Sequence, residues 1–378
     1  MARLGDICTV ISGSTPKTSV EEYWDGDIKW ITPAEINEDS FYITDTVRHI
    51  TERGKCDTGL TVMPIGTVIL SSRAPIGKTA IAGCEMCCNQ GFKNLICSDK
   101  IYNEYLYFFL KGKTDFLNSL GRGATFKEIS KSIVEDIDIP LPDYSTQMKA
   151  ALQMRKIESI ILLRKQQLSK LDELVKSRFI ELFGDYDLSH QQESWIAIKD
   201  IGVVVGGATP KTDRDEYWGG TYRWITPAEL DADSGYIYDS ARKLTRAGVD
   251  SCSLQEMPIG TVILSSRAPI GKVAIAGNTF YCNQGFKNII CKETVTPRYL
   301  YTVLLLNVDY LNSLGRGATF KEISKGIVEN IRIPVPALVL QEQFATFVEQ
   351  VDKSKFEIQK SLEKLEMLKK ALMQKYFG

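Results

Sequence analysis

The chain is one unit of sequence that occurs twice. The fifteen residues LNSLGRGATFKEISK at 117–131 recur letter for letter at 311–325, an offset of 194 residues. At the same offset the blocks WITPAE, MPIGTVILSSRAPIGK and CNQGFKN, which begin at Trp30, Met63 and Cys88, recur as well. A period this long exceeds the 20–50 residues of repeat arrays. The sequence therefore predicts two copies of one domain, which carry out one task at two places.

The similarity between the two copies is uneven along the chain. The blocks at 63–78, 88–94 and 117–131 match their copies almost completely, whereas 145–181 and 339–375 share a pattern more than letters. A recent duplication alone would leave the similarity even. The unevenness indicates that the identical blocks share a specific task.

The first part of each copy mixes short β-rich segments with turns. Segments at 67–70, 78–82 and 94–97 are separated by Pro and Gly residues, and one helical segment covers 103–110. Pro and Gly between short apolar, β-branched runs are typical of strands joined by tight turns. We expect a compact α/β (α+β) domain that ends at the extended segment 139–142.

The second part of each copy has the pattern of a long helix. Residues 145–183 contain no Gly or Pro, and apolar residues such as Met154, Ile157 and Ile161 recur at steps of three and four. This spacing favours a coiled-coil seam. We expect two long antiparallel helices, a globular domain at each end and pseudo-twofold symmetry; the alternative is that each helix folds back on its own domain. The predicted segments are domains at 1–143 and 195–337, helices at 144–184 and 338–378, and a linker at 185–194.

Composition narrows the class of protein. Lys and Arg number 46 against 47 Asp and Glu, so overall charge does not predict a partner. No run of about 18 uncharged apolar residues occurs, and the N-terminus lacks a basic region followed by an apolar one. Nine cysteines without framework spacing fit a reducing compartment. We expect a cytoplasmic protein without a signal peptide or a membrane partner.

Catalytic and metal-binding motifs are incomplete. Gly77-Lys78-Thr79 resembles the end of a phosphate-binding loop, but Ser72 occupies the position of the required first glycine. Cys84, Cys87 and Cys88 suggest zinc, yet in the second copy only the last of them is a cysteine. We therefore expect no metal site and no catalytic residues, and we interpret the chain as one that recognises a partner.

The identical blocks are rich in polar residues at turn-like places. Arg, Lys, Asn and Gln can read guanine and adenine edges, and Ser, Thr and Lys suit phosphates. Each of the cations has the alternative of being a solvated surface charge, and we expect Trp30 and Trp224 to pack in a core and Glu35 to hold a turn. The candidate DNA-contacting residues are Lys17, Tyr23, Ser71, Ser72, Arg73, Lys78, Asn89, Gln90, Lys93, Arg122, Thr125 and Lys127, with Lys211, Tyr217, Ser265, Ser266, Arg267, Lys272, Asn283, Gln284, Lys287, Arg316, Thr319 and Lys321 in the second copy.

The order of these features resembles a known family. A domain, a long helix, a second such domain and a second long helix is the layout of the specificity (S) subunits of type I restriction-modification systems. The motifs that carry the resemblance are WITPAE, SSRAPIGK, NQGFK, GATFKEIS and the Ile-Pro-x-Pro exit, with Gln147 and Gln341 early in each helix. They occur in this order twice and span essentially the whole chain.

The resemblance implies a fold and a function. The domains would be target recognition domains, each reading one half of a split double-stranded DNA sequence, and the helices would space the halves. Two methyltransferase (M) subunits would dock on the helices, and restriction (R) subunits would join them. The resemblance implies no catalytic residue and no cofactor on this chain, with S-adenosylmethionine, ATP and Mg²⁺ on the partner subunits.

The likeness of the two copies adds a hypothesis about the target. Two domains alike in their polar blocks would read the same or nearly the same half-sequence, so the target would be an interrupted palindrome. Two other classes of function remain open. The chain could be a structural scaffold that binds partners without reading DNA, or an enzyme in its own right.

Overall fold

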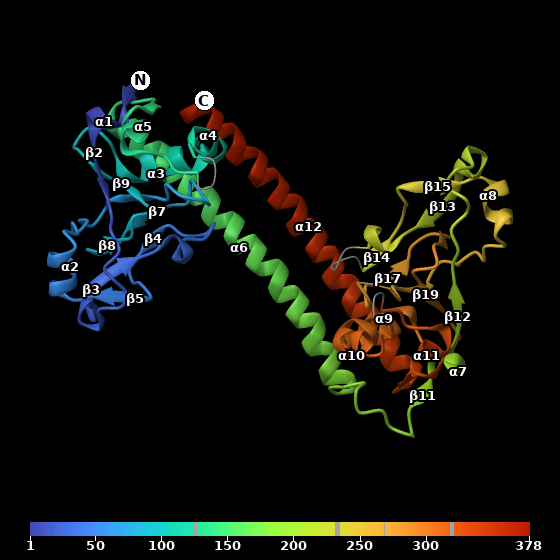
Figure 1. Cartoon of the computed structure of the whole chain (residues 1–378). Coiled ribbons are helices and arrows are strands. Elements are labelled where there is room, and N and C mark those ends of the chain that lie inside the picture. The colour runs from blue at the N-terminus through green and yellow to red at the C-terminus, as the bar shows by residue number, and fades with distance from the viewer. Residues whose placement is uncertain (124–126, 231–234, 268, 318–320) are drawn as a thin grey trace. The chain divides into compact units, whose positions relative to one another are not determined.

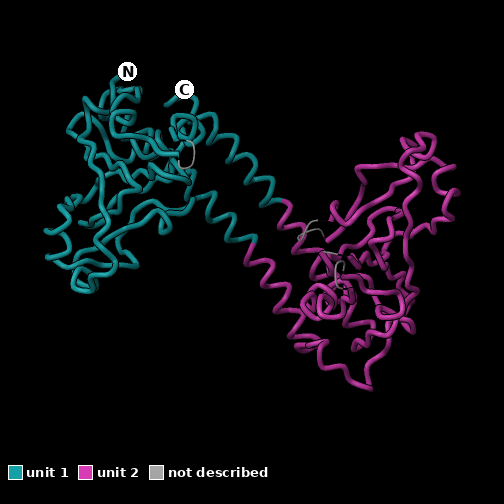
Figure 2. The backbone as a smooth tube through the Cα atoms, viewed as in Figure 1, with its two compact units in different colours: residues 1–168, 357–378 teal, residues 169–356 magenta. Residues whose placement is uncertain are grey.

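The computed structural model describes residues 1–378 except 124–126, 231–234, 268 and 318–320. Two of the candidate DNA-contacting residues, Thr125 and Thr319, lie outside the described residues. The chain forms two compact units (Figure 2), one of residues 1–168 with 357–378 and one of residues 169–356. We call them unit 1 and unit 2. Each unit thus contains one globular domain and a part of both long helices.

The globular domain of unit 1 is built on three sheets (Figure 1). A five-stranded sheet has the order β2-β9-β6-β7-β4, a three-stranded sheet has the order β5-β3-β8, and β1 pairs with β10. The strands are β1 Ala2–Arg3, β2 Cys8–Ser12, β3 Trp24–Ile31, β4 Tyr42–Ile43, β5 Arg48–Ile50, β6 Val68–Leu70, β7 Thr79–Ala82, β8 Cys87–Cys88, β9 Lys93–Cys97 and β10 Asp138–Ile139. The helices of this domain are α1 Leu4–Ile7, α2 Glu52–Asp57, α3 Asn103–Gly112, α4 Thr114–Leu120 and α5 Lys131–Glu135.

The globular domain of unit 2 repeats these three sheets. Their orders are β12-β19-β16-β17-β14, β15-β13-β18 and β11-β20. The strands are β11 Ile196–Ala197, β12 Gly202–Gly206, β13 Trp218–Ile225, β14 Tyr236–Ile237, β15 Arg242–Leu244, β16 Val262–Leu264, β17 Val273–Ala276, β18 Tyr281–Cys282, β19 Lys287–Cys291 and β20 Arg332–Ile333. The helices are α7 Ile198–Ile201, α8 Arg246–Ser251, α9 Pro297–Leu306, α10 Val308–Ser313 and α11 Lys325–Asn330.

The central strands are short and buried on both faces. Every residue of β6 and of β7 is buried, and α3 packs against both strands. Such continuous apolar runs, bounded by Gly and Pro, are typical of strands covered on two sides. The three predicted strands and the predicted helix are thereby confirmed, the helix extending two residues further, to Gly112.

Two helices of 40 residues each form the second part of the copies. They are α6 Tyr144–Phe183 and α12 Leu338–Phe377. In unit 1 the beginning of α6 and the end of α12 lie side by side, with Ile157, Ile161 and Leu362 in one apolar cluster. In unit 2 the end of α6 meets the beginning of α12, since the rings of Phe179 and Phe344 are 5.4 Å apart. The predicted antiparallel pairing is confirmed within each unit.

The last turn of each long helix completes the core of the unit at its far end. Phe377, at the end of α12, lies 4.8 Å from the ring of Tyr105 in α3 of unit 1. Its counterpart Phe183, at the end of α6, lies 4.9 Å from the ring of Tyr299 in α9 of unit 2. Each domain is therefore closed by a residue that is distant in the sequence.

A buried glutamine fastens each domain to the helix that follows it. The Gln147 side chain accepts a hydrogen bond from Tyr102 N at 2.8 Å and donates to the carbonyls of Lys100 and Pro142 at 3.0 and 2.9 Å. The Gln341 side chain repeats this arrangement with Thr296, Thr294 and Pro336. Both glutamines are buried. Because buried backbone groups need hydrogen-bond partners, the two glutamines fix the exit of each domain.

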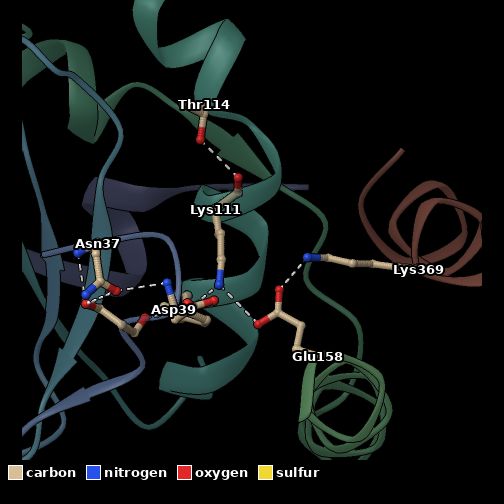
Figure 3. A network of polar contacts seen from close by, with 8 residues as sticks. Asn37, Asp39, Lys111, Thr114, Glu158 and Lys369 are labelled. Atoms are coloured by element: carbon tan, nitrogen blue, oxygen red, sulfur yellow. Dashed lines mark hydrogen bonds and ion pairs between the residues drawn. The ribbon is translucent and has the colours of Figure 1, made fainter. Parts of the chain in front are cut away.

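Unit 1 has a further polar link between α3, α6 and α12 (Figure 3). The Glu158 carboxylate of α6 accepts hydrogen bonds from Lys111 of α3 at 3.1 Å and from Lys369 of α12 at 2.6 Å. Lys111 also donates to the Tyr107 hydroxyl at 2.8 Å. We call Glu158, Lys111 and Lys369 the polar latch. It connects the domain with both helices of the unit.

Across the part of the chain that the structure describes, no helix combines the length and the apolar character that a membrane span requires.

Candidate nucleic-acid interface

The serines after β6 shape the turn that presents Arg73. The Ser71 hydroxyl accepts a hydrogen bond from Lys78 N at 2.9 Å and donates to the Pro75 carbonyl at 2.8 Å, which closes the loop between β6 and β7. Ser71 and Ser72 are fully buried. Their hydroxyls therefore lie inside the domain in this structure, although Ser-Ser-Arg forms one polar run in the sequence.

The backbone of Ser72 joins the three identical blocks. Its N–H donates to the Gly91 carbonyl at 2.7 Å, and its carbonyl accepts from Ile129 N at 2.9 Å. Residues from 71–73, 89–94 and 117–131 thereby meet at one place. This explains why the three blocks are the most similar parts of the two copies: they build one local structure.

A carboxylate lies at the centre of that local structure. The Glu128 side chain accepts a hydrogen bond from Arg73 Nε at 2.9 Å through Oε2 and from Lys93 Nζ at 3.0 Å through Oε1. The Lys93 ammonium also lies 3.5 Å from the Ser72 hydroxyl. The Arg73 side chain is 46% exposed, whereas that of Lys93 is 9% exposed. We call Arg73, Lys93 and Glu128 the arginine cluster of unit 1.

Unit 2 contains the same cluster with nearly the same geometry. Arg267 Nε lies 3.0 Å from Glu322 Oε2, and Lys287 Nζ lies 3.1 Å from Glu322 Oε1. The Arg267 side chain is again 46% exposed. The two units therefore present a guanidinium in the same way, held by the same partner.

The electrostatics of the two carboxylates agree. Burial tends to raise the pKa of Glu128, but hydrogen bonds from Lys93 and Arg73 outweigh it and lower the pKa below its usual value. The pKa of Glu322 is lowered in the same way, against burial, by Lys287 and Arg267. Opposite charges within hydrogen-bond distance favour the ionised carboxyl group. Both glutamates are therefore anionic at neutral pH.

Two further cations flank the arginine cluster. The backbones of Arg122 and Glu128 pair with each other, N to O at 3.0 Å and 2.9 Å, so Arg122 lies beside Arg73 across Glu128. Gly123 follows at φ 125°, a conformation that side chains rarely permit. Arg122 and Lys127 are exposed, and neither side chain forms an ion pair within the described part of the chain.

The block Asn89–Lys93 forms a turn next to the cluster. The Asn89 side chain accepts a hydrogen bond from Gly91 N at 2.9 Å, which holds the turn. The exposed Gln90 side chain accepts from the Thr15 hydroxyl, which brings the segment containing Lys17 to the same region. Tyr23 lies apart from these contacts and donates from its hydroxyl to Asp57 at 3.0 Å.

The residues of the WITPAE block make contacts inside the domain. Trp30 is buried and donates from its ring nitrogen to the Ser14 carbonyl at 3.1 Å, as expected of a packing residue. The Glu35 side chain accepts from Thr32 N at 2.8 Å and from Val47 N at 2.8 Å, so the expected turn is confirmed. Lys78 donates to the Pro33 carbonyl at 2.9 Å, so its ammonium is used within the domain.

The candidate DNA-contacting residues thus fall into three groups by exposure. The exposed ones can reach a ligand without rearrangement, while the buried ones hold the turns that carry them. Exposed are Lys17, Arg73, Gln90, Arg122 and Lys127 with Lys211, Arg267, Gln284, Arg316 and Lys321. Partly exposed are Tyr23, Lys78 and Asn89 with Tyr217, Lys272, Asn283 and Lys287; buried are Ser71, Ser72 and Lys93 with Ser265 and Ser266.

Metal coordination has no candidate among the residues that the structure describes. No group of three or more His, Cys, Asp or Glu side chains there is arranged to hold an ion. Burial raises the pKa of the Cys88 and Cys282 thiols to about 12. A hydrogen bond from Asn94 or Asn288 lowers the pKa, but its effect is smaller than that of burial. These two cysteines are therefore protonated packing residues at neutral pH.

The chain is similar to known proteins over most of its length. The family model described as type I restriction modification DNA specificity domain matches residues 1–173 and again 194–369. A relative, the type I restriction enzyme MjaIX specificity subunit of Methanocaldococcus jannaschii, is 38% identical over 194 residues, which cover 50% of this chain and 45% of the relative. This chain thus matches about half the length of that relative.

Two further comparisons extend over the whole chain. The type I restriction enzyme MjaVIII specificity subunit of the same organism is 23% identical over 399 aligned positions, covering 99% of this chain and 90% of the relative. The crystal structure of a type I restriction-modification system S subunit from M. genitalium superimposes with a TM-score of 0.61 at 15% identity, over 100% of this chain and 95% of that one. The structural likeness shows a shared fold. With two matches of the family model in tandem, this chain belongs to the family of type I restriction-modification DNA specificity proteins.

Proposed function

We propose that this chain is the DNA sequence-specificity subunit of a type I restriction-modification complex, and that each globular domain reads one half of a bipartite target. The observation that carries the proposal is the arginine cluster, which recurs in both units with donor–acceptor distances that agree within about 0.1 Å. An arginine whose side chain is 46% exposed, with Arg122 and Lys127 exposed nearby, fits a base edge with phosphates on either side.

The likeness of the clusters supports a symmetric target. Two equal sets of side chains make equal contacts, so the two half-sites would have the same or nearly the same sequence in opposite orientation. The target would then be an interrupted palindrome. Two unrelated half-sites would contradict this part of the proposal.

The long helices are the proposed docking surface for methyltransferase subunits. Exposed apolar side chains on them include Leu163 at 58%, Phe356 at 66% and Met367 at 63%. Large apolar side chains that remain exposed in each unit are candidates for contact with a partner protein. We propose two methyltransferase subunits on these helices and restriction subunits that join them, in the cytoplasm. S-adenosylmethionine, ATP and Mg²⁺ would be bound by those subunits, and this chain would carry out no catalytic step.

The experiment is co-purification of the chain with its methyltransferase subunit, followed by mapping of methylated adenines in the host genome. We expect methylation at one interrupted motif with matching half-sites. The alternative of a scaffold without sequence readout predicts a stable complex whose methylation follows no bipartite motif, and that result would overturn the proposal. Methyl transfer by the purified chain alone would contradict the assignment of catalysis to its partners.

Salt dependence gives an independent test. With a net charge of −1 the chain cannot hold DNA by overall charge, and only a few cations flank each cluster. The dependence of binding on salt reports the number of phosphate contacts. We expect the isolated chain to bind target DNA weakly with a small salt slope, measured by fluorescence anisotropy. Tight sequence-specific binding by the isolated chain would contradict this division of labour.

A further inference from the structure

We propose that Glu128 and Glu322 are positioning residues, each of which fixes one arginine so that its two free Nη groups read a guanine in the corresponding half-site. The inference rests on the proposed function, because it assumes that the arginine clusters face DNA. It adds two carboxylates, residues of the wrong charge for a DNA contact, to the specificity-determining set. It also states which base each cluster reads.

One edge of the Arg73 guanidinium is left free. Arg73 uses its Nε to donate to Glu128, and within the described part of the chain neither Nη group makes a hydrogen bond or an ion pair. Two Nη groups form a planar fork with fixed spacing. Guanine offers two acceptors, O6 and N7, at its major-groove edge, and a bidentate arginine is the commonest specific contact to it. The free fork therefore matches guanine better than any other base.

The Glu128 carboxylate is itself held in one orientation. One oxygen of Glu128 accepts from Arg73 and the other accepts from Lys93, which is almost fully buried. The backbone of the same residue pairs in both directions with Arg122. An arginine held by a partner that is fixed at three points loses little further freedom on binding, which favours recognition. In this arrangement Lys93 acts as the counter-ion of Glu128 and does not contact DNA.

The same arrangement is repeated in unit 2. Glu322 holds Arg267 through the same atoms, with Lys287 as its counter-ion. Some other ion pairs differ between the copies, such as Lys29 with Asp45, whose counterpart pairs Arg223 with Asp239. Because the two arginines are held in the same way, both half-sites should contain guanine at the equivalent position.

A structural role would have a different consequence from a positioning role. If Glu128 only balanced the charge of two nearby cations, its neutralisation would strengthen binding to all DNA sequences alike, because one repulsion with phosphates would disappear. If it positions Arg73, its neutralisation releases the guanidinium and weakens discrimination at one base pair. The two roles are therefore separated by a base-by-base measurement of specificity.

The experiment uses the full-length chain co-produced with its methyltransferase subunit, and a double-stranded DNA library randomised across both half-sites and sequenced after selection. We expect Glu128→Gln to reduce the preference for guanine by about tenfold or more at one position of one half-site. Glu322→Gln should do the same in the other half-site only. The matched control is Glu135→Gln, which removes a partly exposed carboxylate that pairs with Lys131 and forms no ion pair with the cluster among the described residues.

A second variant protects the test against a folding defect. Arg73→Lys keeps the charge but removes the fork, and we expect it to lose guanine preference at the same position as Glu128→Gln, with the other half-site read normally. Uniformly tighter binding by Glu128→Gln, an unchanged base profile, or a preferred base other than guanine at the affected position would each overturn the inference while leaving the proposed function standing. A wild-type complex that selects no bipartite sequence would overturn the proposed function and this inference with it.

Discussion

The two units are alike where they present the arginine clusters and different where their domains are seated on the long helices. The cluster residues and their distances repeat almost without change. Among the seating contacts, the buried glutamines Gln147 and Gln341 and the terminal phenylalanines Phe377 and Phe183 repeat, whereas the ion pairs between domain and helix do not. The difference teaches that the duplicated task lies in the cluster, whereas the seat of each domain has adapted to its own surroundings.

The sign of a buried charge shows the divergence most clearly. In unit 1, Glu104 of α3 accepts a hydrogen bond from Arg155 of α6 at 3.1 Å; in unit 2, the equivalent Arg298 of α9 donates to Asp352 of α12 at 2.8 Å. The side chains of Glu104 and Arg298 are only 5% and 7% exposed. Seated on the start of α12, Glu104 would face Asp352, so two like charges would come together, which is costly in a buried site.

The polar latch is a second difference. At the positions equivalent to Lys111 and Lys369, unit 2 has Leu305 and Val175. Val175 packs against the apolar core of unit 2. In unit 2 the position of Lys111 is thus an exposed leucine, and Asp352, the equivalent of Glu158, pairs with Arg298 instead.

The largest effect is expected from reversing the buried charge of unit 1. Glu104→Arg should place two arginines side by side and destabilise unit 1 by about 3 kcal/mol or more, since a buried charge loses its partner and gains a repulsion. Adding Arg155→Glu should restore most of the loss. Hydrogen-exchange mass spectrometry, which reports each unit separately, measures the effect. Equal hydrogen-exchange protection of unit 1 in Glu104→Arg and in the wild type would show that the sign of this buried charge does not matter for stability.

The glutamines test the part of the seat that the units share. Gln147→Ala leaves the N–H of Tyr102 and two carbonyls without their partner, and Gln341→Ala does so in unit 2. Each should cost about 2 kcal/mol, because buried polar groups lose hydrogen bonds. We expect equal losses of exchange protection in the respective units. Clearly unequal losses of protection in the two variants would mean that the contacts between domain and helix differ between the units here as well.

A smaller effect is expected from the polar latch. Glu158→Ala should destabilise unit 1 by about 1 kcal/mol, because both lysines that it pairs with keep access to water. The double variant Lys111→Leu with Lys369→Val, which introduces the unit 2 residues at these two positions, should cost more than Glu158→Ala, because it leaves the Glu158 carboxylate, only 19% exposed, without a cationic partner. A loss in that variant no larger than in Glu158→Ala, measured by urea denaturation, would contradict this expectation.

The smallest effect concerns pH and should be the same in both units. The lowered pKa values of Glu128 and Glu322 imply stability that is present above the ordinary carboxyl pKa and lost as the pH falls through the lowered values. The Glu128→Gln and Glu322→Gln variants should each lose this stability at neutral pH and converge with the wild type in acid. Thermal denaturation between pH 7 and pH 3 measures the difference. A gap that widens in acid would contradict the sign.

The sequence was sufficient for much of the fold because its signals are local. Gly and Pro mark the ends of β6 and β7, and a run without either marks α6. The arginine cluster was only partly predictable, since Arg73, Lys93 and Glu128 meet through long-range contacts across 55 and 35 positions. Glu128 was missed although it lies inside the repeated fifteen residues, because an acidic residue does not suit a direct contact with DNA.

Burial was the other property that the sequence did not reveal. Ser72 and Arg73 are neighbours in one polar block, yet the first is buried and the second half exposed. Which of them faces water depends on the approach of Gly91 and Ile129 to the backbone of Ser72. The charge reversal between Glu104 and Arg298 is visible in the letters, but its meaning requires knowing which helix residue lies opposite.

The end of α12 belongs to unit 1, although it follows all of unit 2 in the sequence, and this affects the order in which the two units can fold during synthesis. Unit 1 includes residues 357–378, and Phe377 fills its core against Tyr105. During synthesis the N-terminal domain leaves the ribosome first, but Phe377, which packs in its core, is translated after residues 169–356 of unit 2. Unit 2 consists of the contiguous residues 169–356, so it needs no segment that is translated later than residue 356. The domain that is translated first is therefore the one whose core is completed by the segment translated last of the two units.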